Sequence, residues 1–107
     1  MYAGAMHAVV NRIQLREPLS VEEVAAAQAD LTALAGTIEG LAAVHMLRTG
    51  EGDLIVLVIG DDADALERTR TELGNSLMRR YVIPHASGPP ERTVAEAIIT
   101  YERAPAA

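Results

Sequence analysis

The sequence predicts an α+β fold in which two helices cover a four-stranded antiparallel sheet. Two helical patterns are interleaved with four strand-like ones, and a glycine-containing turn joins the middle pair of strands. The third strand-like segment, Asp53 to Gly60, holds six consecutive aliphatic residues. Such a run is too short for a buried helix and is typical of a strand that is covered on both faces.

The first strand and the first helix carry the clearest local signals. Met6 to Leu15 alternates as a strand, and a proline follows it. One predicted face of this strand holds His7, Val9, Asn11, Ile13 and Leu15. Ser20 and Glu23 have the spacing of a capping box, so we expect a helix that starts here and ends at Gly36 or Gly40.

The middle of the chain is predicted to form a hairpin followed by a second helix. Leu41 to Thr49 alternates as a strand, Gly50 to Asp53 supplies the turn, and the aliphatic strand follows. Gly60-Asp61-Asp62 then breaks the strand and caps a helix. We expect that helix to fade between Asn75 and Tyr81.

The last predicted elements complete the topology. Val82 to Arg92 contains three prolines and is predicted to be irregular, and Thr93 to Glu102 alternates as the final strand. The order strand, helix, strand, strand, helix, strand is that of the ferredoxin-like fold. Because two helices cover only one face of such a sheet, the other face of Asp53 to Gly60 needs cover from outside. We expect a homodimer in which a second copy supplies it.

Composition narrows the classes of function. At 107 residues the chain is expected to be one domain, residues 1–107. It has no cysteine, which excludes disulfides and thiolate metal sites. A net charge of -6 argues against nucleic-acid binding, and no apolar run is long enough to predict a membrane span. The N-terminus lacks the pattern of a signal peptide, so a cytoplasmic protein is expected.

The order and length of the elements from Met6 to Glu102 resemble those of the dimeric α+β-barrel superfamily, in particular its antibiotic-biosynthesis-monooxygenase domain group. Three stretches carry the likeness: Val9 to Ile13, Ile38 to Leu41 and Met46 to Arg48. The resemblance implies a dimer with a pocket in each subunit, between the open sheet face and the second helix. The group includes cofactor-independent oxygenases of polyketide-like aromatics, haem-degrading oxygenases and proteins of no known activity.

The resemblance also suggests which residues would form a site. The haem-degrading branch uses an Asn on the first strand, a Trp on the second helix and a His near the end of that helix. Asn11 and His85 match the first and third, but the chain has no Trp, so haem is the least favoured option and no cofactor is expected. The oxygenase branch surrounds an aromatic substrate with Trp, Tyr, Asn and Arg, for which Tyr81, Asn11 and Arg79 or Arg80 are available.

Asn11 and the histidines are the candidate catalytic residues. The Asn11 amide either orients a ligand carbonyl or dioxygen, or forms a hydrogen bond across the dimer or to a loop. His45 and His7 are each either a general base or a structural histidine. His85 is the first choice among the three, because a proline-pinned irregular segment carries function more often than a strand does.

Charged groups near the second helix allow two interpretations. The Arg79-Arg80 doublet either attracts an anionic ligand or helps to close the dimer, or it places favourable cations at a helix C-terminus. Asp61, Asp62 and Asp64 lie where helix caps belong, so we predict capping and no metal site.

Three functional hypotheses follow from the sequence. The first is a small-molecule enzyme or binder of the monooxygenase-like group, with an apolar pocket lined by Asn11, His45, Tyr81 and His85. The second is a non-catalytic dimeric accessory module, whose sheet interface would be packed shut by aliphatic side chains. The third is a haem-binding or haem-degrading protein.

Overall fold

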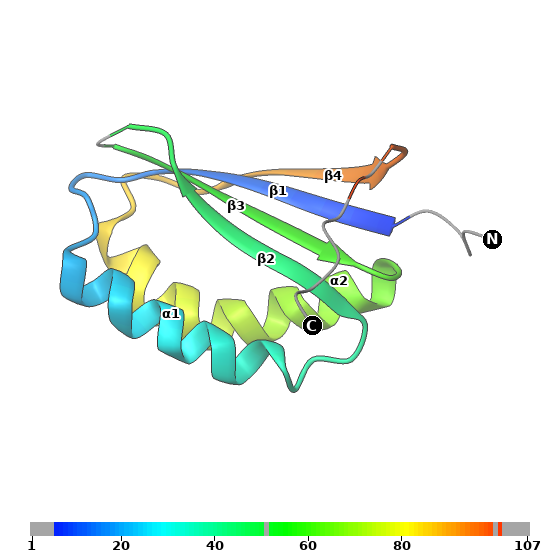
Figure 1. Cartoon of the computed structure of the whole chain (residues 1–107). Coiled ribbons are helices and arrows are strands. Elements are labelled where there is room, and N and C mark those ends of the chain that lie inside the picture. Colours follow the sequence, from blue (N-terminus) through cyan, green and yellow to red (C-terminus); the bar gives the residue numbers. More distant parts are fainter. Residues whose placement is uncertain (1–5, 51, 100, 102–107) are drawn as a thin grey trace.

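A four-stranded antiparallel sheet in the order β2-β3-β1-β4 lies over a single layer formed by two helices (Figure 1). The computed structural model describes residues 6–50, 52–99 and 101. Its elements are β1 (Met6–Gln14), α1 (Val21–Ala35), β2 (Leu41–Arg48), β3 (Asp53–Gly60), α2 (Ala63–Leu73), the π-helical segment η1 (Gly74–Val82), the short 3-10 helix η2 (Ile83–His85) and β4 (Glu91–Ala97). The predicted α+β, ferredoxin-like fold is confirmed.

The local signals for the first helix are confirmed in the structure. The Ser20 hydroxyl accepts a hydrogen bond from the Glu23 backbone at 3.0 Å, and the Glu23 carboxylate accepts one from the Ser20 backbone at 2.9 Å. Helix α1 ends at Gly36. Gly40 has a φ of 84°, and a Cβ there would lie 2.8 Å from the Cβ of Ala65. A glycine is therefore needed where the chain passes α2 on its way into β2.

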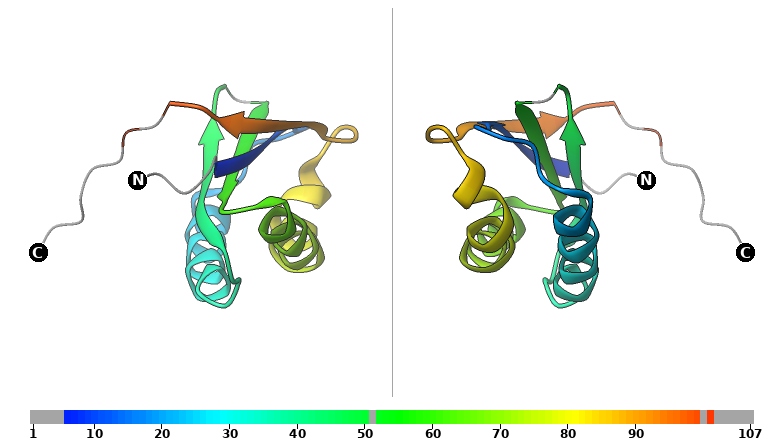
Figure 2. Two further views of the ribbon diagram at one scale, coloured as in Figure 1. Left: turned by 90° about the vertical axis from the view of Figure 1, so that its right-hand side faces the viewer. Right: turned by 90° about the vertical axis from the view of Figure 1, so that its left-hand side faces the viewer.

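The core lies between the sheet and the helices. In β3 the side chains of Leu54, Val56 and Val58 are buried against the helices, while Ile55, Leu57 and Ile59 alternate with them and are only half-buried. The views along the sheet show both helices on the same side of it (Figure 2). The strand predicted to be covered on both faces is thus covered on one face by its own chain.

The second helix continues further than the sequence predicted. It does not fade before Tyr81 but runs on as η1 and η2 to His85, inside the segment predicted to be irregular. Tertiary packing explains the difference, because Leu77 and Val82 are buried at 2% and 1% exposure and outweigh the weak helix preference of the Gly-Asn-Ser start.

The last strand also differs from its prediction. β4 spans Glu91–Ala97, where Thr93 to Glu102 was expected. It begins directly after Pro90, which ends the proline-containing segment and has no N–H to donate to a strand ladder. Its last residue, Ala97, pairs with Met6 of β1. Ile98 and Ile99 are exposed, and residues 100 and 102 lie outside the described residues.

The sheet face turned away from the helices is uncovered within the described part of the chain, and it is apolar along β3, with Arg12 and His45 beside it on the neighbouring strands. Strand alternation and pairing place Val10, Leu47, Ile55, Leu57 and Ile59 on this uncovered face. No helix among the described residues is both long and apolar enough to span a membrane.

Candidate functional site

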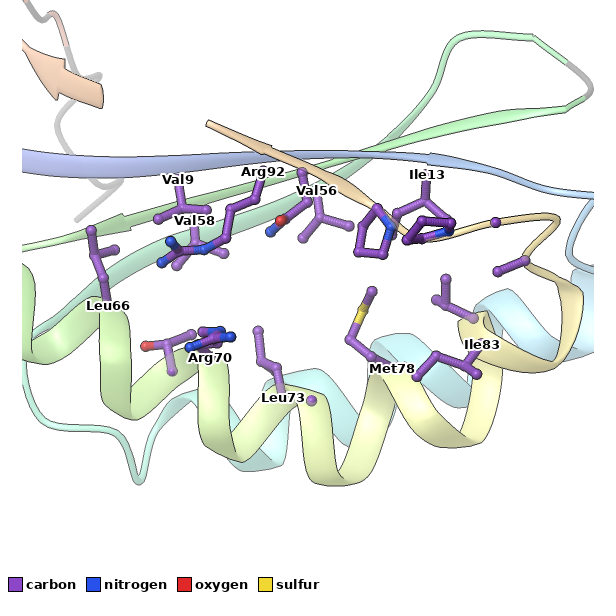
Figure 3. Close-up of a pocket in the computed structure, with 18 residues that line it drawn as sticks. Val9, Ile13, Val56, Val58, Leu66, Arg70, Leu73, Met78, Ile83 and Arg92 are labelled. Atoms are coloured by element: carbon purple, nitrogen blue, oxygen red, sulfur yellow. The ribbon is translucent and has the colours of Figure 1, made fainter. Parts of the chain in front are cut away.

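A cavity of about 590 Å³ lies between the helix-covered face of the sheet and the helical segment α2–η1 (Figure 3). The pocket therefore adjoins the second helix, as the resemblance had suggested, but it lies on the helix-covered face of the sheet and not on the open face. Strands β1 and β3 form its roof, and α2 and η1 form its floor. Its apolar walls come from Val9, Ile13, Val56, Val58, Leu66, Leu73, Met78, Val82 and Ile83.

Few polar side chains line this pocket. Within the described residues they are Asn11, Thr69, Arg70 and Arg92. The Thr69 hydroxyl donates to the Ala65 carbonyl at 2.8 Å, so its proton is already used within α2. In the part of the chain that the structure describes, the Asn11 amide forms no hydrogen bond, neither to a loop nor to a neighbouring strand. Its donor and acceptor are free for a molecule in the pocket.

Backbone register explains why Asn11 faces the pocket. Asn11 pairs with Val56 of β3 on one side and with Arg92 of β4 on the other. Its neighbours along the same face of β1 are Val9 and Ile13, which are buried at 4% and 2% exposure. Within the described residues, the Asn11 side-chain amide is thus the one polar group that β1 presents to the pocket, between two apolar side chains.

His85 lies outside the pocket and is held between two carboxylates. Its Nδ1 is 2.9 Å from Oε1 of Glu17, and its Nε2 is 2.7 Å from Oε2 of Glu23. These hydrogen bonds raise the pKa of His85, that to Glu23 most. The pKa of Glu23 is lowered to about 2, first by the Ser20 backbone N–H and second by His85. Through these two contacts the His85 ring joins η2 to the start of α1 and to the loop before it.

We expect the His85 cluster to stabilise the fold most between pH 4.5 and 6.5, the ordinary pKa values of Glu and His. Because the folded-state pKa of His85 is raised, its contribution is complete below 6.5 and is lost as the pH rises through the folded value. The Glu23 contribution is complete above 4.5 and is lost as the pH falls towards 2.

Melting temperatures of the wild type and of His85→Gln, measured across pH, test this expectation. The difference in melting temperature between the two proteins should be largest inside that window and should become smaller as the pH rises above 6.5. A difference that is constant with pH, or that widens above neutrality, would contradict the assigned role of the cluster.

Tyr81 and Arg80 connect the η1 segment to helix α1. The Tyr81 hydroxyl donates to Oδ2 of Asp30 at 2.6 Å, and Arg80 Nη1 lies 3.1 Å from the same oxygen. The hydrogen bond to Asp30 is the main reason that the pKa of Tyr81 is raised. Both side chains therefore tie η1 to α1, and neither lines the pocket.

The structure does not bring the predicted site residues together. Of Asn11, His45, Tyr81 and His85, only Asn11 lines the pocket. His45 is exposed on β2, where it pairs with Leu57, and it borders a separate groove of about 420 Å³ between α1 and β2. Arg79 is exposed on η1 and Arg80 binds Asp30, so both also lie outside the pocket lining. Their expected roles in catalysis and ligand binding stay predictions.

The pocket does not fit a histidine-ligated haem. His7, His45 and His85 are the three histidines of the chain, and none of them lines the cavity.

Of the Asp residues at the start of α2, Asp62 caps the helix as predicted, since its Oδ1 accepts a hydrogen bond from the Ala65 backbone at 2.8 Å. Among the described residues, no cluster of three or more His, Asp or Glu side chains could hold a metal ion.

Sequence reasoning missed the two arginines of the pocket. Arg70 interrupts the apolar stripe of the second helix, and this interruption was a usable signal for a polar contact on the buried side. Arg92 had no such signal, because its place opposite Asn11 depends on the register between β1 and β4.

No family model matches the sequence, and no curated protein matches it either. Solved structures do match. NE2512, a protein of unknown function from Nitrosomonas europaea, is 17% identical with a TM-score of 0.73, covering 94% of this chain and 97% of that chain. SnoaB, a cofactor-independent oxygenase from Streptomyces nogalater, is 17% identical with a TM-score of 0.67, covering 94% and 100%.

A third similar structure is a proposed antibiotic biosynthesis monooxygenase from Caulobacter crescentus. It is 23% identical with a TM-score of 0.65, and the match covers 92% of this chain and 94% of that chain. At these identities the likeness establishes the fold, which is that of the antibiotic-biosynthesis-monooxygenase-like proteins, as the element order had suggested.

Proposed function

We propose that this chain, which has the fold of the antibiotic-biosynthesis-monooxygenase-like proteins, binds a small aromatic molecule between its sheet and α2. The observation that carries the proposal is a cavity of about 590 Å³ with apolar walls and one free amide, that of Asn11. Cavities of this size with few polar groups are typical of small-molecule sites. A pocket volume near zero would have favoured the non-catalytic accessory module, so the volume found here supports a ligand-binding protein.

The chemistry proposed for the pocket is oxygenation without a cofactor. Such a reaction needs a substrate acidic enough to lose its proton to solvent, because within the described residues no histidine, aspartate or glutamate lines the pocket. The resulting enolate or phenolate then passes electrons to dioxygen itself. The Asn11 amide can donate a hydrogen bond to the developing oxyanion of the substrate, and the apolar walls exclude water, which strengthens that bond. The likeness to the oxygenase SnoaB supports this reaction class.

Binding of neutral fluorescent probes tests the pocket and the role of Asn11. Prodan, a naphthalene with a carbonyl acceptor, and N-phenyl-1-naphthylamine, which has no carbonyl, should both bind the wild type. We expect Asn11→Leu to raise the Kd of Prodan by up to about tenfold, the value of one hydrogen bond, and to spare the second probe.

Asn75→Leu is the matched control for this substitution, because Asn75 is exposed on η1 and does not line the pocket. It should leave both probes unaffected. If the wild type binds neither probe, the proposed pocket function is wrong. Dioxygen uptake with anthrone, an enolisable tricyclic ketone, and no added cofactor then separates an enzyme from a binder.

We also propose that the chain is a single domain that works as a cytoplasmic homodimer, with the uncovered sheet face as its seam. Support comes from the apolar side chains on that face, for which the described part of the chain offers no cover. A contact of sheet on sheet would bury Ile55, Leu57 and Ile59 from both copies.

A further inference from the structure

Two arginines bring positive charge to the pocket. Arg70 of α2 and Arg92 of β4 both line it, and within the described residues no aspartate or glutamate does so. Their side chains extend from opposite walls into the space between sheet and helix (Figure 3). Two guanidinium groups beside an apolar cavity stabilise an anion, and here they do so in a chain whose net charge is -6.

The register of the sheet places Arg92 next to Asn11. The two residues are directly opposite in the β1–β4 ladder, so their side chains leave the same face about 5 Å apart at Cβ. The Arg92 side chain is 33% exposed and that of Arg70 is 66% exposed. A polar strip therefore runs from the free Asn11 amide through Arg92 to Arg70 at the solvent edge of the pocket.

Glu67 contacts both arginines but holds neither firmly. Its Oε1 is 3.4 Å from Nη2 of Arg92, and its Oε2 is 3.5 Å from Nη1 of Arg70. The Glu67 side chain is 59% exposed, and ion pairs of this length and exposure contribute little. An oxyanion that enters the pocket can replace Glu67 as the partner of both guanidinium groups.

We infer that the ligand of this pocket is an apolar molecule that carries a carboxylate or a similar oxyanion, which Arg70 and Arg92 bind at the edge of the cavity. The inference rests on the proposed function, since it names the ligand class of the same pocket. The apolar body of the ligand packs against Val56 and Met78, next to the Asn11 amide.

Two probes with the same aromatic body test this inference in the full chain. N-phenyl-1-naphthylamine is neutral, and 1-anilinonaphthalene-8-sulfonate adds a sulfonate that stands in for the oxyanion. We expect the sulfonate probe to bind more tightly. Arg70→Gln and Arg92→Gln should each raise its Kd about tenfold and change the Kd of the neutral probe by less than about twofold.

Two further substitutions separate ligand binding from a structural ion pair. Glu67→Gln removes the competing carboxylate and should tighten binding of the sulfonate probe, whereas a structural role for Glu67 predicts no gain. Arg68→Gln removes the same charge from α2 outside the pocket, where Arg68 donates to the Glu39 carbonyl at 2.8 Å. It should leave the affinity for the sulfonate probe unchanged, and added NaCl should weaken only that probe.

The outcomes distinguish this inference from the function on which it rests. The proposed anion site is wrong if the neutral probe binds and the sulfonate probe binds no more tightly. It is also wrong if neither arginine substitution raises the Kd of the sulfonate probe. Neither result contradicts the proposed apolar pocket. If the wild type does not bind the neutral probes at all, both proposals fall. The melting temperature of each variant, compared with that of the wild type, shows whether a lower affinity is caused by a loss of folded protein.

Discussion

Leu57→Glu is expected to convert the protein from a dimer into a folded monomer. Leu57 lies in the middle of the uncovered sheet face, between Ile55 and Ile59 on β3. In a two-fold symmetric dimer, the substitution places a carboxylate in the seam from both copies. Burying two carboxylates in an apolar seam costs several kcal/mol, of which the neighbouring His45 of β2 offsets only a part, so the dissociation constant of the dimer should rise by at least about tenfold.

Light scattering coupled to size exclusion, at micromolar protein, measures the number of chains in each particle. Ala33→Glu adds the same charge to an exposed position of α1 and should leave the dimer intact. Circular dichroism then shows whether the Leu57→Glu monomer keeps its helices and strands. A monomeric wild type, or a Leu57→Glu protein that remains a folded dimer, would rule out a seam on this face.

Leu77→Ala is expected to lower the free energy of unfolding by about 2–5 kcal/mol, the usual cost of a leucine-sized deletion in a core. Leu77 is 2% exposed and packs in the cluster that joins the sheet to the helices. Its loss leaves a cavity where η1 meets the core, and it removes the packing that holds this weakly helical stretch in place.

Urea titration measures the change in unfolding free energy. The protein concentration is held fixed, because dimer formation would couple to unfolding. The comparison variant is Val21→Ala, at a position of α1 that is 83% exposed, which should change stability by less than about 0.5 kcal/mol. Equal effects of the two substitutions would show that η1 is not part of the cooperative core.

Local signals predicted the elements that depend on neighbours in sequence. The capping box of Ser20 and Glu23 and the unbroken aliphatic run of β3 involve residues close together in the sequence, so pattern alone was enough. The extension of the second helix through η1 was not predictable in this way. It depends on the burial of Leu77 and Val82 against strands from other parts of the chain.

The candidate site residues show the same difference between what a local pattern predicts and what long-range packing decides. Asn11 was recognisable as a polar residue between Val9 and Ile13 on an apolar strand face, and it does line the pocket. His85 was chosen for its place in a proline-rich segment, yet its carboxylate partners come from the other end of the chain. Contacts between residues 62 or more positions apart are set by packing, which no local pattern records.

The sequence by itself determined the order of strands and helices along the chain, the helix starts and the apolar character of both faces of Asp53 to Gly60, because these depend on spacing and side-chain type. The tertiary structure alone decided that the pocket lies on the helix-covered face, and that Arg70 and Arg92 stand on either side of it. The physical reason is that a pocket is a property of register and packing between elements. The residues that line the pocket come together only when β1 and β4 pair in register and α2 packs against the sheet.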